Sequence, residues 1–185
     1  MKNSYSNIFL FNKKILNKTI KVLNKGSLIA LPTETVYGLA GSAYSRASVA
    51  KIYQLKRRPK LNPLIIHYYD INQISDDVII NDHFKKLYKQ LCPGPITFIL
   101  NQKKKSKISK AATNKKNTLA VRFPKHPVAR ILLKHLQFPI AAPSANISSR
   151  VSAVTSSDVK DDFGKKIKYI LEGGRSSVGV ESTII

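Results

Sequence analysis

The stretch ASVAKIYQLKRRPKLNPLIIH, residues 47–67, holds a candidate helix, a cationic turn and a candidate strand in direct succession. Apolar side chains recur every three or four residues from Val49 as far as Lys56, which predicts a helix over Ala47–Arg57 with one buried face. Two prolines then end the helix, because the residue before a proline disfavours helical geometry. The apolar run Pro63–Tyr69 predicts a buried strand. A helix that leads into such a strand is the repeating unit of α/β folds.

The same alternation extends in both directions along the chain. Helical spacing of apolar residues predicts helices over Asn12–Lys25 and Pro127–Gln137, and a third helix capped by Asp82. Short apolar runs predict strands at Ser27–Leu31, Pro95–Leu100, Leu119–Phe123, Pro139–Ala142 and Lys168–Leu171. We therefore expect one domain over residues 1–185, an α/β fold with a twisted mixed β-sheet and helices on both faces.

Positive charge dominates the composition. The 185 residues include 32 Lys and Arg against 10 Asp and Glu, a formal net charge of +22. This excess predicts attraction to polyanions, nucleic acid above all, although lysines spread over solvated faces would give the same composition without any site. The densest basic run, NQKKKSKISKAATNKKN at residues 101–117, has few apolar residues and is expected to be a mobile loop or hairpin tip.

Several classes of protein are disfavoured by what the sequence lacks. A single cysteine, Cys92, excludes an internal disulfide, fits a reducing compartment and has the apolar neighbours of a buried structural thiol. Apolar runs are too short to span a bilayer and the polar N-terminus does not resemble a signal peptide, so we expect a cytoplasmic protein outside membranes. There is no P-loop, Rossmann fingerprint, zinc-ligand spacing or nucleophile elbow, and no metal site is expected.

Polar clusters follow four of the predicted strands, at Pro32–Thr35, His67, Arg122 and Pro143–Asn146. Ligands of α/β sheets bind where strands end and loops diverge, so the four clusters together predict one polar crevice. Each cluster alone is also ordinary turn chemistry, and a lone histidine at a strand end is commonly satisfied within the fold. Arg122 lies between apolar residues and needs an anion, for which Glu34, Glu181 or a ligand carboxylate are candidates.

The cations of the opening stretch have different expected positions. Lys56 continues the apolar stripe and is expected to point toward the sheet, whereas Arg57 lies nearer the solvent. Pro59 pushes Arg58 off the helix axis, so that Lys56 and Arg58 can converge on phosphate oxygens. A lysine that snorkels at a helix C-terminus is the alternative interpretation.

Six blocks carry a family resemblance, in this order along the chain: LPTETVYGLA (31–40), KRRPKLNPLIIH (56–67), PGPITFIL (93–100), TLAVRFP (118–124), APSANIS (142–148) and VGVESTI (178–184). Together they make the chain resemble the YrdC-like threonylcarbamoyl-AMP synthases, in the bacterial single-domain form called TsaC. The resemblance covers nearly the whole chain from residue 26. It implies a twisted α/β fold with a concave basic face.

The reaction implied by the resemblance joins L-threonine, bicarbonate or CO2, and ATP into threonylcarbamoyl-AMP and pyrophosphate, with Mg2+ carried by the nucleotide. A downstream threonylcarbamoyl-transferase complex would then modify adenosine 37 of tRNAs that read ANN codons. The resemblance assigns threonine contacts to Thr35, His67, Arg122, Ala142 and Ser182. It assigns ATP contacts to Lys56, Arg58, Asn62, Thr118, Ser144, Asn146 and Ser152, with Lys56 and Arg58 also catalytic through the developing phosphate charge. Glu34 is a candidate for assisting deprotonation of the amine.

The chain departs from the family pattern in two places. Ser148–Ser152 replaces a Ser-Gly-x-Pro-Ser pattern, and the sequence reaches Ile185 without the arginine-bearing strand usual in relatives. Either Arg150 or Arg175 would substitute for that arginine, or ATP would bind more weakly. Weak tRNA binding by the basic run at 103–116 is a further expectation. Two non-catalytic alternatives stay open, a basic RNA-binding module and an inactive interaction subunit of the same tRNA-modification pathway.

Overall fold

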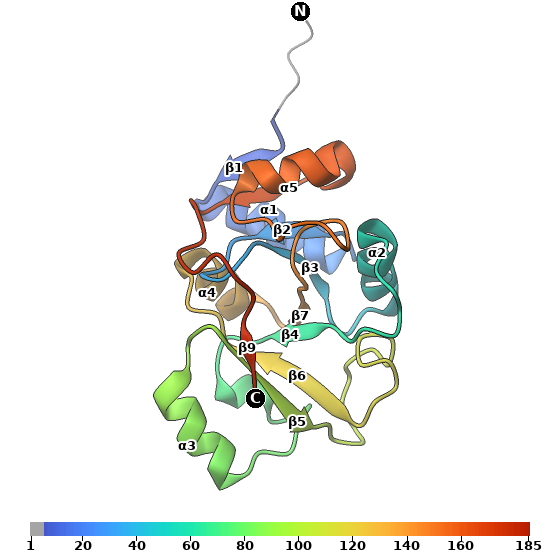
Figure 1. Ribbon diagram of the computed structural model, residues 1–185, viewed down its shortest axis with the longest axis vertical. Helices are drawn as coiled ribbons and strands as arrows, with labels where there is room; N and C mark the ends of the chain where they lie inside the picture. The colour runs from blue at the N-terminus through green and yellow to red at the C-terminus, as the bar shows by residue number, and fades with distance from the viewer. Residues whose placement is uncertain (1–5) are drawn as a thin grey trace, which may run out of the picture.

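Nine strands form one sheet, in the order β1-β8-β2-β3-β7-β4-β6-β5-β9, within residues 6–185, the part of the chain that this computed structural model describes (Figure 1). The strands are β1 (Ile8–Leu10), β2 (Ile29–Leu31), β3 (Gly38–Ser42), β4 (Ile65–His67), β5 (Ile96–Asn101), β6 (Thr118–Arg122), β7 (Ile140–Ala141), β8 (Ile170–Glu172) and β9 (Thr183–Ile184). Neighbours β4 and β6 run parallel, whereas β7 runs antiparallel to β4 and β5 runs antiparallel to β6. The predicted mixed sheet is confirmed.

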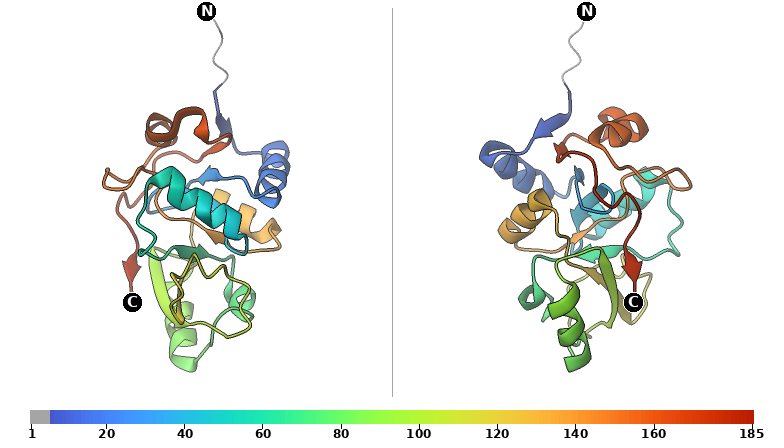
Figure 2. Two further views of the ribbon diagram at one scale, coloured as in Figure 1. Left: turned by 90° about the vertical axis from the view of Figure 1, so that its right-hand side faces the viewer. Right: turned by 60° about the vertical axis from the view of Figure 1, so that its left-hand side comes forward.

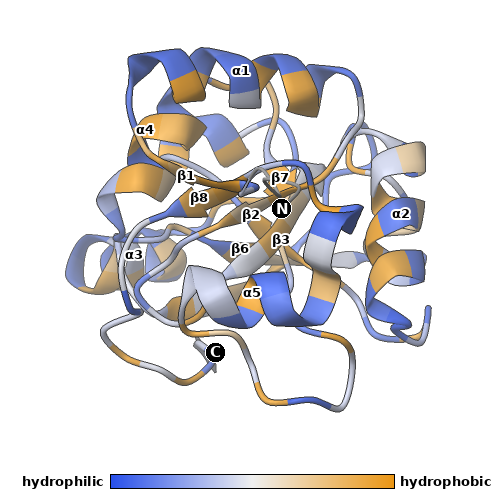
Figure 3. Cartoon of the chain, turned by 90° about the horizontal axis from the view of Figure 1, so that it is seen from above, coloured by the Kyte–Doolittle hydropathy of each residue, from blue (hydrophilic) through white to orange (hydrophobic). Residues whose placement is uncertain are grey.

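Helices cover both faces of this sheet, as predicted. They are α1 (Lys13–Asn24), α2 (Arg46–Lys56), α3 (Asp82–Leu91), α4 (Pro127–His135) and α5 (Ser156–Phe163), with short 3-10 helices η1 (Ile71–Ile74) and η2 (Gly164–Lys166). Seen from above, α1 and α4 lie on one side of the strands and α5 on the other (Figure 3). Side chains alternate accordingly along β2, where Ile29 and Leu31 pack with α1 and α4 while Ala30 joins the core beneath α2 and α5. None of the described helices combines the length and the apolar composition needed to cross a membrane.

Local capping fixes where the helices begin, and one predicted cap is wrong. Asn12 caps α1 by accepting a hydrogen bond from the Ile15 amide, and Asn81, rather than Asp82, caps α3 through the Phe84 amide. Asn81 has the extended backbone that a cap requires, which leaves Asp82 as the first residue of the helix itself.

Four elements have sequence signals too weak for prediction, namely β1, β3, β9 and α5. Strand β3 illustrates the reason. Its sequence GLAGS has little strand propensity, yet all five residues are buried between β2 and β7. A Cβ atom at Gly41 would lie 2.6 Å from Cδ2 of Leu28, so tight packing selects glycine here over a strand-forming residue.

The basic run at 101–117 connects β5 to β6 and lies beside α2 (Figure 2, left). Its loop character is confirmed, but the loop is packed against the domain. Ile108 and Ala112 are buried in the core, the Ser109 amide donates to the Ala43 carbonyl at 2.9 Å, and the Leu64 amide donates to the Ala112 carbonyl at 2.8 Å. The segment joins the antiparallel strands β5 and β6, as the predicted hairpin connection does, while a few apolar residues among the lysines anchor it to the core.

Candidate active site

The polar strand ends converge as predicted, because they belong to neighbouring strands. His67 at the end of β4 lies opposite Arg122 at the end of parallel β6, and β7 leads beside them into the Pro143–Asn146 turn. A bridge between Gly38 and Ser144 holds this turn against β3. The result is a small hollow of about 20 Å3, lined among others by Thr33, His67, Arg122, Ala142, Ser144 and Glu181.

Arg122 is a buried cation, and Glu34 provides its counter-charge in a buried ion pair. Nη2 of Arg122 lies 2.8 Å from Oε1 of Glu34, and Oε2 of Glu34 accepts the amides of Lys125 at 2.9 Å and His126 at 3.3 Å. Burial alone would raise the pKa of Glu34, but the charge and hydrogen bond of Arg122 outweigh it, so that the pKa is lowered. Both oxygens of this ionised carboxylate are in use, so the expected role of Glu34 in deprotonating an amine has no geometric support.

Two residues that line the hollow each have a buried nitrogen without a hydrogen-bond partner in the described part of the chain. The nitrogens are Nε of Arg122 and Nδ1 of His67. Burial, with the neighbouring positive charge of Arg122, lowers the pKa of His67 to about 3, so its imidazole is neutral at pH 7. An unpaired buried polar group costs roughly 1–3 kcal/mol, which a polar ligand would recover.

Three of the five residues assigned to threonine meet in this hollow, namely His67, Arg122 and Ala142. The other two do not line it. The Thr35 hydroxyl is buried 2.9 Å from the Thr33 hydroxyl, and the Ser182 hydroxyl lies 2.7 Å from that of Thr97. Thr33, two positions before Thr35 in the same Pro-Thr-Glu-Thr run, lines the hollow instead.

A second hollow of about 310 Å3 adjoins the first, and the two share Ser144 and Glu181. Six of the seven residues assigned to ATP line it: Lys56, Arg58, Asn62, Ser144, Asn146 and Ser152. Thr118 does not, because it pairs with Asn101 at the far end of β6. Arg150 does line this hollow and forms a 2.7 Å ion pair with Asp162, whereas Arg175 does not line it.

Lys56 points inward, as its place on the helical stripe predicts, and is 1% exposed. Its ammonium group donates to the main-chain oxygens of Ser144 at 2.5 Å and Asn146 at 2.6 Å, and to Oδ1 of Asn146 at 3.2 Å. Burial, followed by the charge of Arg58, lowers the pKa of Lys56 to about 8. All three donors already have acceptors, so Lys56 shapes the Ser144–Asn146 turn and the snorkelling alternative is wrong.

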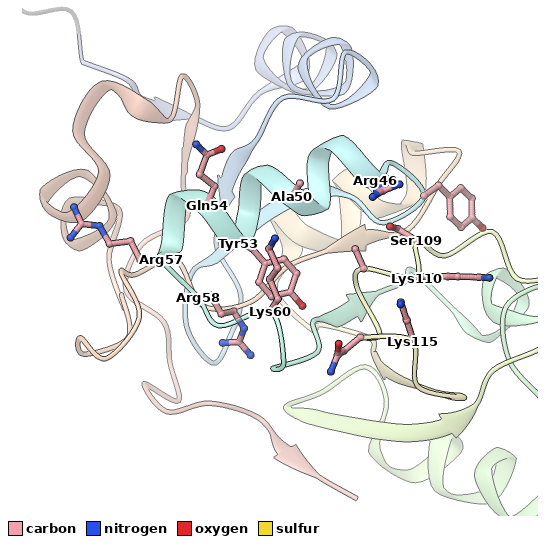
Figure 4. Close-up of a pocket in the computed structure, with 13 residues that line it drawn as sticks. Arg46, Ala50, Tyr53, Gln54, Arg57, Arg58, Lys60, Ser109, Lys110 and Lys115 are labelled. Atoms are coloured by element: carbon pink, nitrogen blue, oxygen red, sulfur yellow. The ribbon is translucent and has the colours of Figure 1, made fainter.

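Arg57 and Arg58 then leave the end of α2 in different directions (Figure 4). Arg57 has a left-handed backbone with φ of 53°, which turns the chain sharply and leaves its side chain exposed. Arg58 donates from Nη2 to the Pro63 carbonyl at 3.2 Å and lines the hollow of about 310 Å3. The predicted separation of the two arginines is confirmed.

Glu181 is the residue that the site assignments omit. It lines both hollows, and its Oε1 accepts a hydrogen bond from Ser152 at 2.9 Å. The sequence offers one signal for it, its position directly before Ser182 in the VGVESTI block.

Two larger basic hollows flank the outer face of α2. One of about 1000 Å3 lies between α2 and the 101–117 loop and is lined by Arg46, Arg57, Arg58, Lys60, Lys110 and Lys115 among others (Figure 4). The other, of about 450 Å3, includes Lys51, Lys166 and Lys168. Gln54 and Arg57 line both, so the two hollows meet across the helix.

Neither a metal centre nor a reactive thiol is evident in residues 6–185. Within that range no three His, Cys, Asp or Glu side chains are grouped to hold a metal ion. Cys92 is half-buried, and burial raises the pKa of its thiol to about 12, which agrees with the predicted structural role.

Comparison with known proteins places this geometry in a family. The family model Sua5/YciO/YrdC, described as "Telomere recombination", matches residues 21–185. The chain belongs to this family. The resemblance of the six sequence blocks is thereby confirmed, and so is the α/β fold that it implied.

Individual Sua5/YciO/YrdC relatives carry a more specific name. Proteins named threonylcarbamoyl-AMP synthase from Pyrococcus abyssi and Bacillus subtilis are each 41% identical, over 88% and 89% of this chain. The chain spans about half the length of these two relatives, 48% and 47%. The crystal structure of P. abyssi Sua5 complexed with L-threonine is 36% identical with a TM-score of 0.93, and the match covers 97% of this chain and 54% of that one.

Proposed function

We propose that this protein makes threonylcarbamoyl-AMP and pyrophosphate from L-threonine, bicarbonate or CO2, and ATP. One observation carries the proposal. A hollow with an unpartnered guanidinium nitrogen and a neutral imidazole adjoins a larger hollow lined by Lys56, Arg58 and Arg150. The first suits the carboxylate and hydroxyl of a small amino acid, and the second suits a triphosphate. The names of the relatives and the threonine complex of Sua5 support the same assignment.

The side chains then have separate tasks. Nε of Arg122 receives the threonine carboxylate, and Arg58 and Arg150 offset charge on the triphosphate as pyrophosphate leaves. Lys56 acts indirectly by holding the Ser144–Asn146 turn. The amine attacks the carbon of bicarbonate or CO2 and the carbamate then attacks the α-phosphorus, so the protein aligns reactants and needs no covalent nucleophile. The first hollow now has room for about one water molecule, so threonine must displace side chains at its mouth.

Mg2+ would enter with the triphosphate, because phosphate oxygens and water supply most of its preferred ligands. The product is a reactive mixed anhydride, and a transferase complex acting on tRNA would consume it. Reaction with these soluble substrates would take place in the cytoplasm.

Pyrophosphate release tests the proposal. The protein is incubated with ATP, Mg2+, L-threonine and bicarbonate, and each component is omitted in turn. We expect release only when threonine and bicarbonate are both present. Arg122→Ala should raise the KM for threonine far more than that for ATP, and Arg58→Ala should do the reverse. Absence of release by the wild-type protein would favour an inactive interaction subunit.

The two basic hollows beside α2 favour RNA contact as an additional role. Nine of the nineteen residues that line them are Lys or Arg, against 32 of 185 in the chain, and within residues 6–185 no Asp or Glu lines either hollow. Such a surface attracts a phosphate backbone without reading its sequence.

The salt dependence of tRNA binding distinguishes binding at these hollows from nonspecific attraction by the net positive charge of the protein. Replacing Lys110 and Lys115 by Glu should weaken tRNA binding. The logarithm of the association constant for tRNA should then fall less steeply with the logarithm of the salt concentration, with a slope smaller in magnitude by about 2. Replacing Lys14 and Lys18 by Glu, on exposed positions of α1, changes the net charge equally and should leave the slope nearer that of the wild type. Equal effects of the two double variants would indicate nonspecific attraction only.

A further inference from the structure

Glu181 stands at the junction of the two hollows of the candidate active site. Three hydrogen bonds anchor its segment: the amides of Val178 and Gly179 donate to the carbonyls of Glu34 and Thr35 at 2.8 and 3.0 Å, and the Thr183 amide donates to the Pro95 carbonyl at 3.1 Å. Among the described residues that line either hollow, Glu181 is the one carboxylate. The fold thus holds a single negative charge between the amino-acid and nucleotide subsites.

An amino acid needs both an anion and a cation from its binding site. Arg122 keeps an unpartnered Nε for the carboxylate, because its contact with Glu34 uses Nη2. Glu34 does not line the hollow, and three of its roughly four acceptor positions are already used by Arg122 and two main-chain amides. Glu181 lines the same hollow as Arg122, and Ser152 donates to its Oε1, so that Oε2 is available to a ligand. The pair Arg122 and Glu181 therefore matches the two charges of a zwitterion.

The other titratable groups of the amino-acid hollow are poor proton acceptors. Burial keeps His67 neutral by lowering its pKa to about 3. The Tyr37 hydroxyl donates to the Gly174 carbonyl at 2.8 Å, and burial raises its pKa to about 12. In the adjoining hollow, Lys56 has all three donors on carbonyl oxygens.

We propose that Glu181 binds the ammonium group of the amino-acid substrate and accepts one of its protons, an inference that rests on the proposed function. In the step with bicarbonate, one ammonium N–H bond breaks, its electron pair stays on nitrogen and the proton moves to Glu181. The amine then forms the N–C bond. The hydroxide of bicarbonate leaves with a second amine proton as water, which yields the carbamate. Because Glu181 is exposed, solvent can remove its proton before the next turnover.

The pH dependence of the Glu181→Gln variant provides the decisive kinetic test. Glutamine keeps the shape of the side chain but cannot take the proton, so kcat/KM for threonine at pH 7 should fall about a hundredfold. The variant depends on threonine that is already deprotonated, so its kcat/KM should rise about tenfold per pH unit from pH 6.5 to 8.5, while that of the wild type stays nearly flat. Asp161→Asn, at an exposed position of α5, removes the same charge and should behave as the wild type. A Glu181→Gln profile parallel to that of the wild type, or a deficit below threefold, overturns the inference.

A binding measurement separates this inference from the proposed function. Calorimetry compares L-threonine with 2,3-dihydroxybutanoate, which keeps the carboxylate and the 3-hydroxyl but has an uncharged hydroxyl in place of the amine. The wild type should prefer threonine at least tenfold, and Glu181→Gln should lose that preference while Asp161→Asn keeps it. If the wild type releases no pyrophosphate, the proposed function fails, yet loss of the amine preference in Glu181→Gln still supports the role of Glu181. An unchanged preference overturns that role whatever the activity.

Discussion

Nζ of Lys56 lies 2.6 Å from the main-chain oxygen of Asn146, and this contact joins the last residue of α2 to the turn after β7. A cation at the end of a helix usually reaches solvent, but here its ammonium group is enclosed by the carbonyl oxygens of Ser144 and Asn146. The helix therefore fixes the shape of the hollow of about 310 Å3 beside this turn as well as covering the sheet.

We expect Lys56→Met to lower the free energy of unfolding by about 1–3 kcal/mol, because it leaves these carbonyl oxygens buried without a donor. ATP affinity should fall as the turn loosens, whereas threonine affinity should change little. Denaturant unfolding and calorimetry with each ligand measure the two effects. Lys51→Met, at an exposed position of the same helix, is the control and should leave both affinities unchanged.

The Arg122–Glu34 pair predicts an asymmetric double-mutant cycle. Glu34→Gln leaves the Arg122 guanidinium buried without its counter-charge and should destabilise the fold by about 3 kcal/mol. Combining it with Arg122→Met removes the uncompensated charge and should restore much of that loss. Urea unfolding of the four proteins measures the coupling. Additive effects would contradict a buried pair, and Asp82→Asn, which breaks an exposed pair with Lys85, should change stability little.

His67 predicts a specific dependence of stability on pH. Its folded pKa of about 3 lies below the usual 6.5, so the folded protein cannot take up the proton that the unfolded chain binds as the pH falls below 6.5. The contribution of His67 is fully present above pH 6.5 and declines by about 1.4 kcal/mol per pH unit below it. Unfolding free energies between pH 4.5 and 7 should fall more steeply for the wild type than for His67→Asn. Equal slopes would show that His67 titrates normally.

The strands and helices with strong apolar periodicity follow from the sequence, and so does the convergence of His67 and Arg122 at one crevice. The spacing around Lys56 also predicts its inward direction. What it cannot predict is that the acceptors of Lys56 would be carbonyl oxygens, because main-chain groups carry no sequence signature. The choice of Glu34 over Glu181 as the partner of Arg122 depends in the same way on distances set by several loops.

Elements that rely on tertiary packing are the ones that sequence reasoning misses. Strand β3 is formed by small residues because its neighbours leave no room for larger ones. The 101–117 loop looks mobile from its lysines, and only Ile108 and Ala112 indicate that it is anchored. Both cases are tertiary context overriding local propensity.

A buried carboxylate, Asp77, also anchors that loop, and its contacts predict how the loop could be released. Asp77 accepts hydrogen bonds from the hydroxyls of Tyr68 at 2.8 Å, Tyr44 at 3.1 Å and Ser106 at 2.6 Å, and its carbonyl accepts the Lys103 amide at 2.8 Å. Ser106→Ala removes the one side-chain link between Asp77 and the loop, so we expect trypsin to cleave within 103–116 several times faster, with the free energy of unfolding lowered by about 1 kcal/mol.

Limited proteolysis followed by mass spectrometry locates these cuts, and Ser157→Ala, at an exposed position of α5, serves as the control. Cleavage should remain slow in this control, because Asp77 keeps all of its donors. Unchanged cleavage in Ser106→Ala would mean that Ile108 and Ala112 hold the loop without help from Asp77. Faster cleavage combined with weaker tRNA binding would link the anchor to the basic hollow beside α2, since Lys110 and Lys115 line that hollow from the same loop.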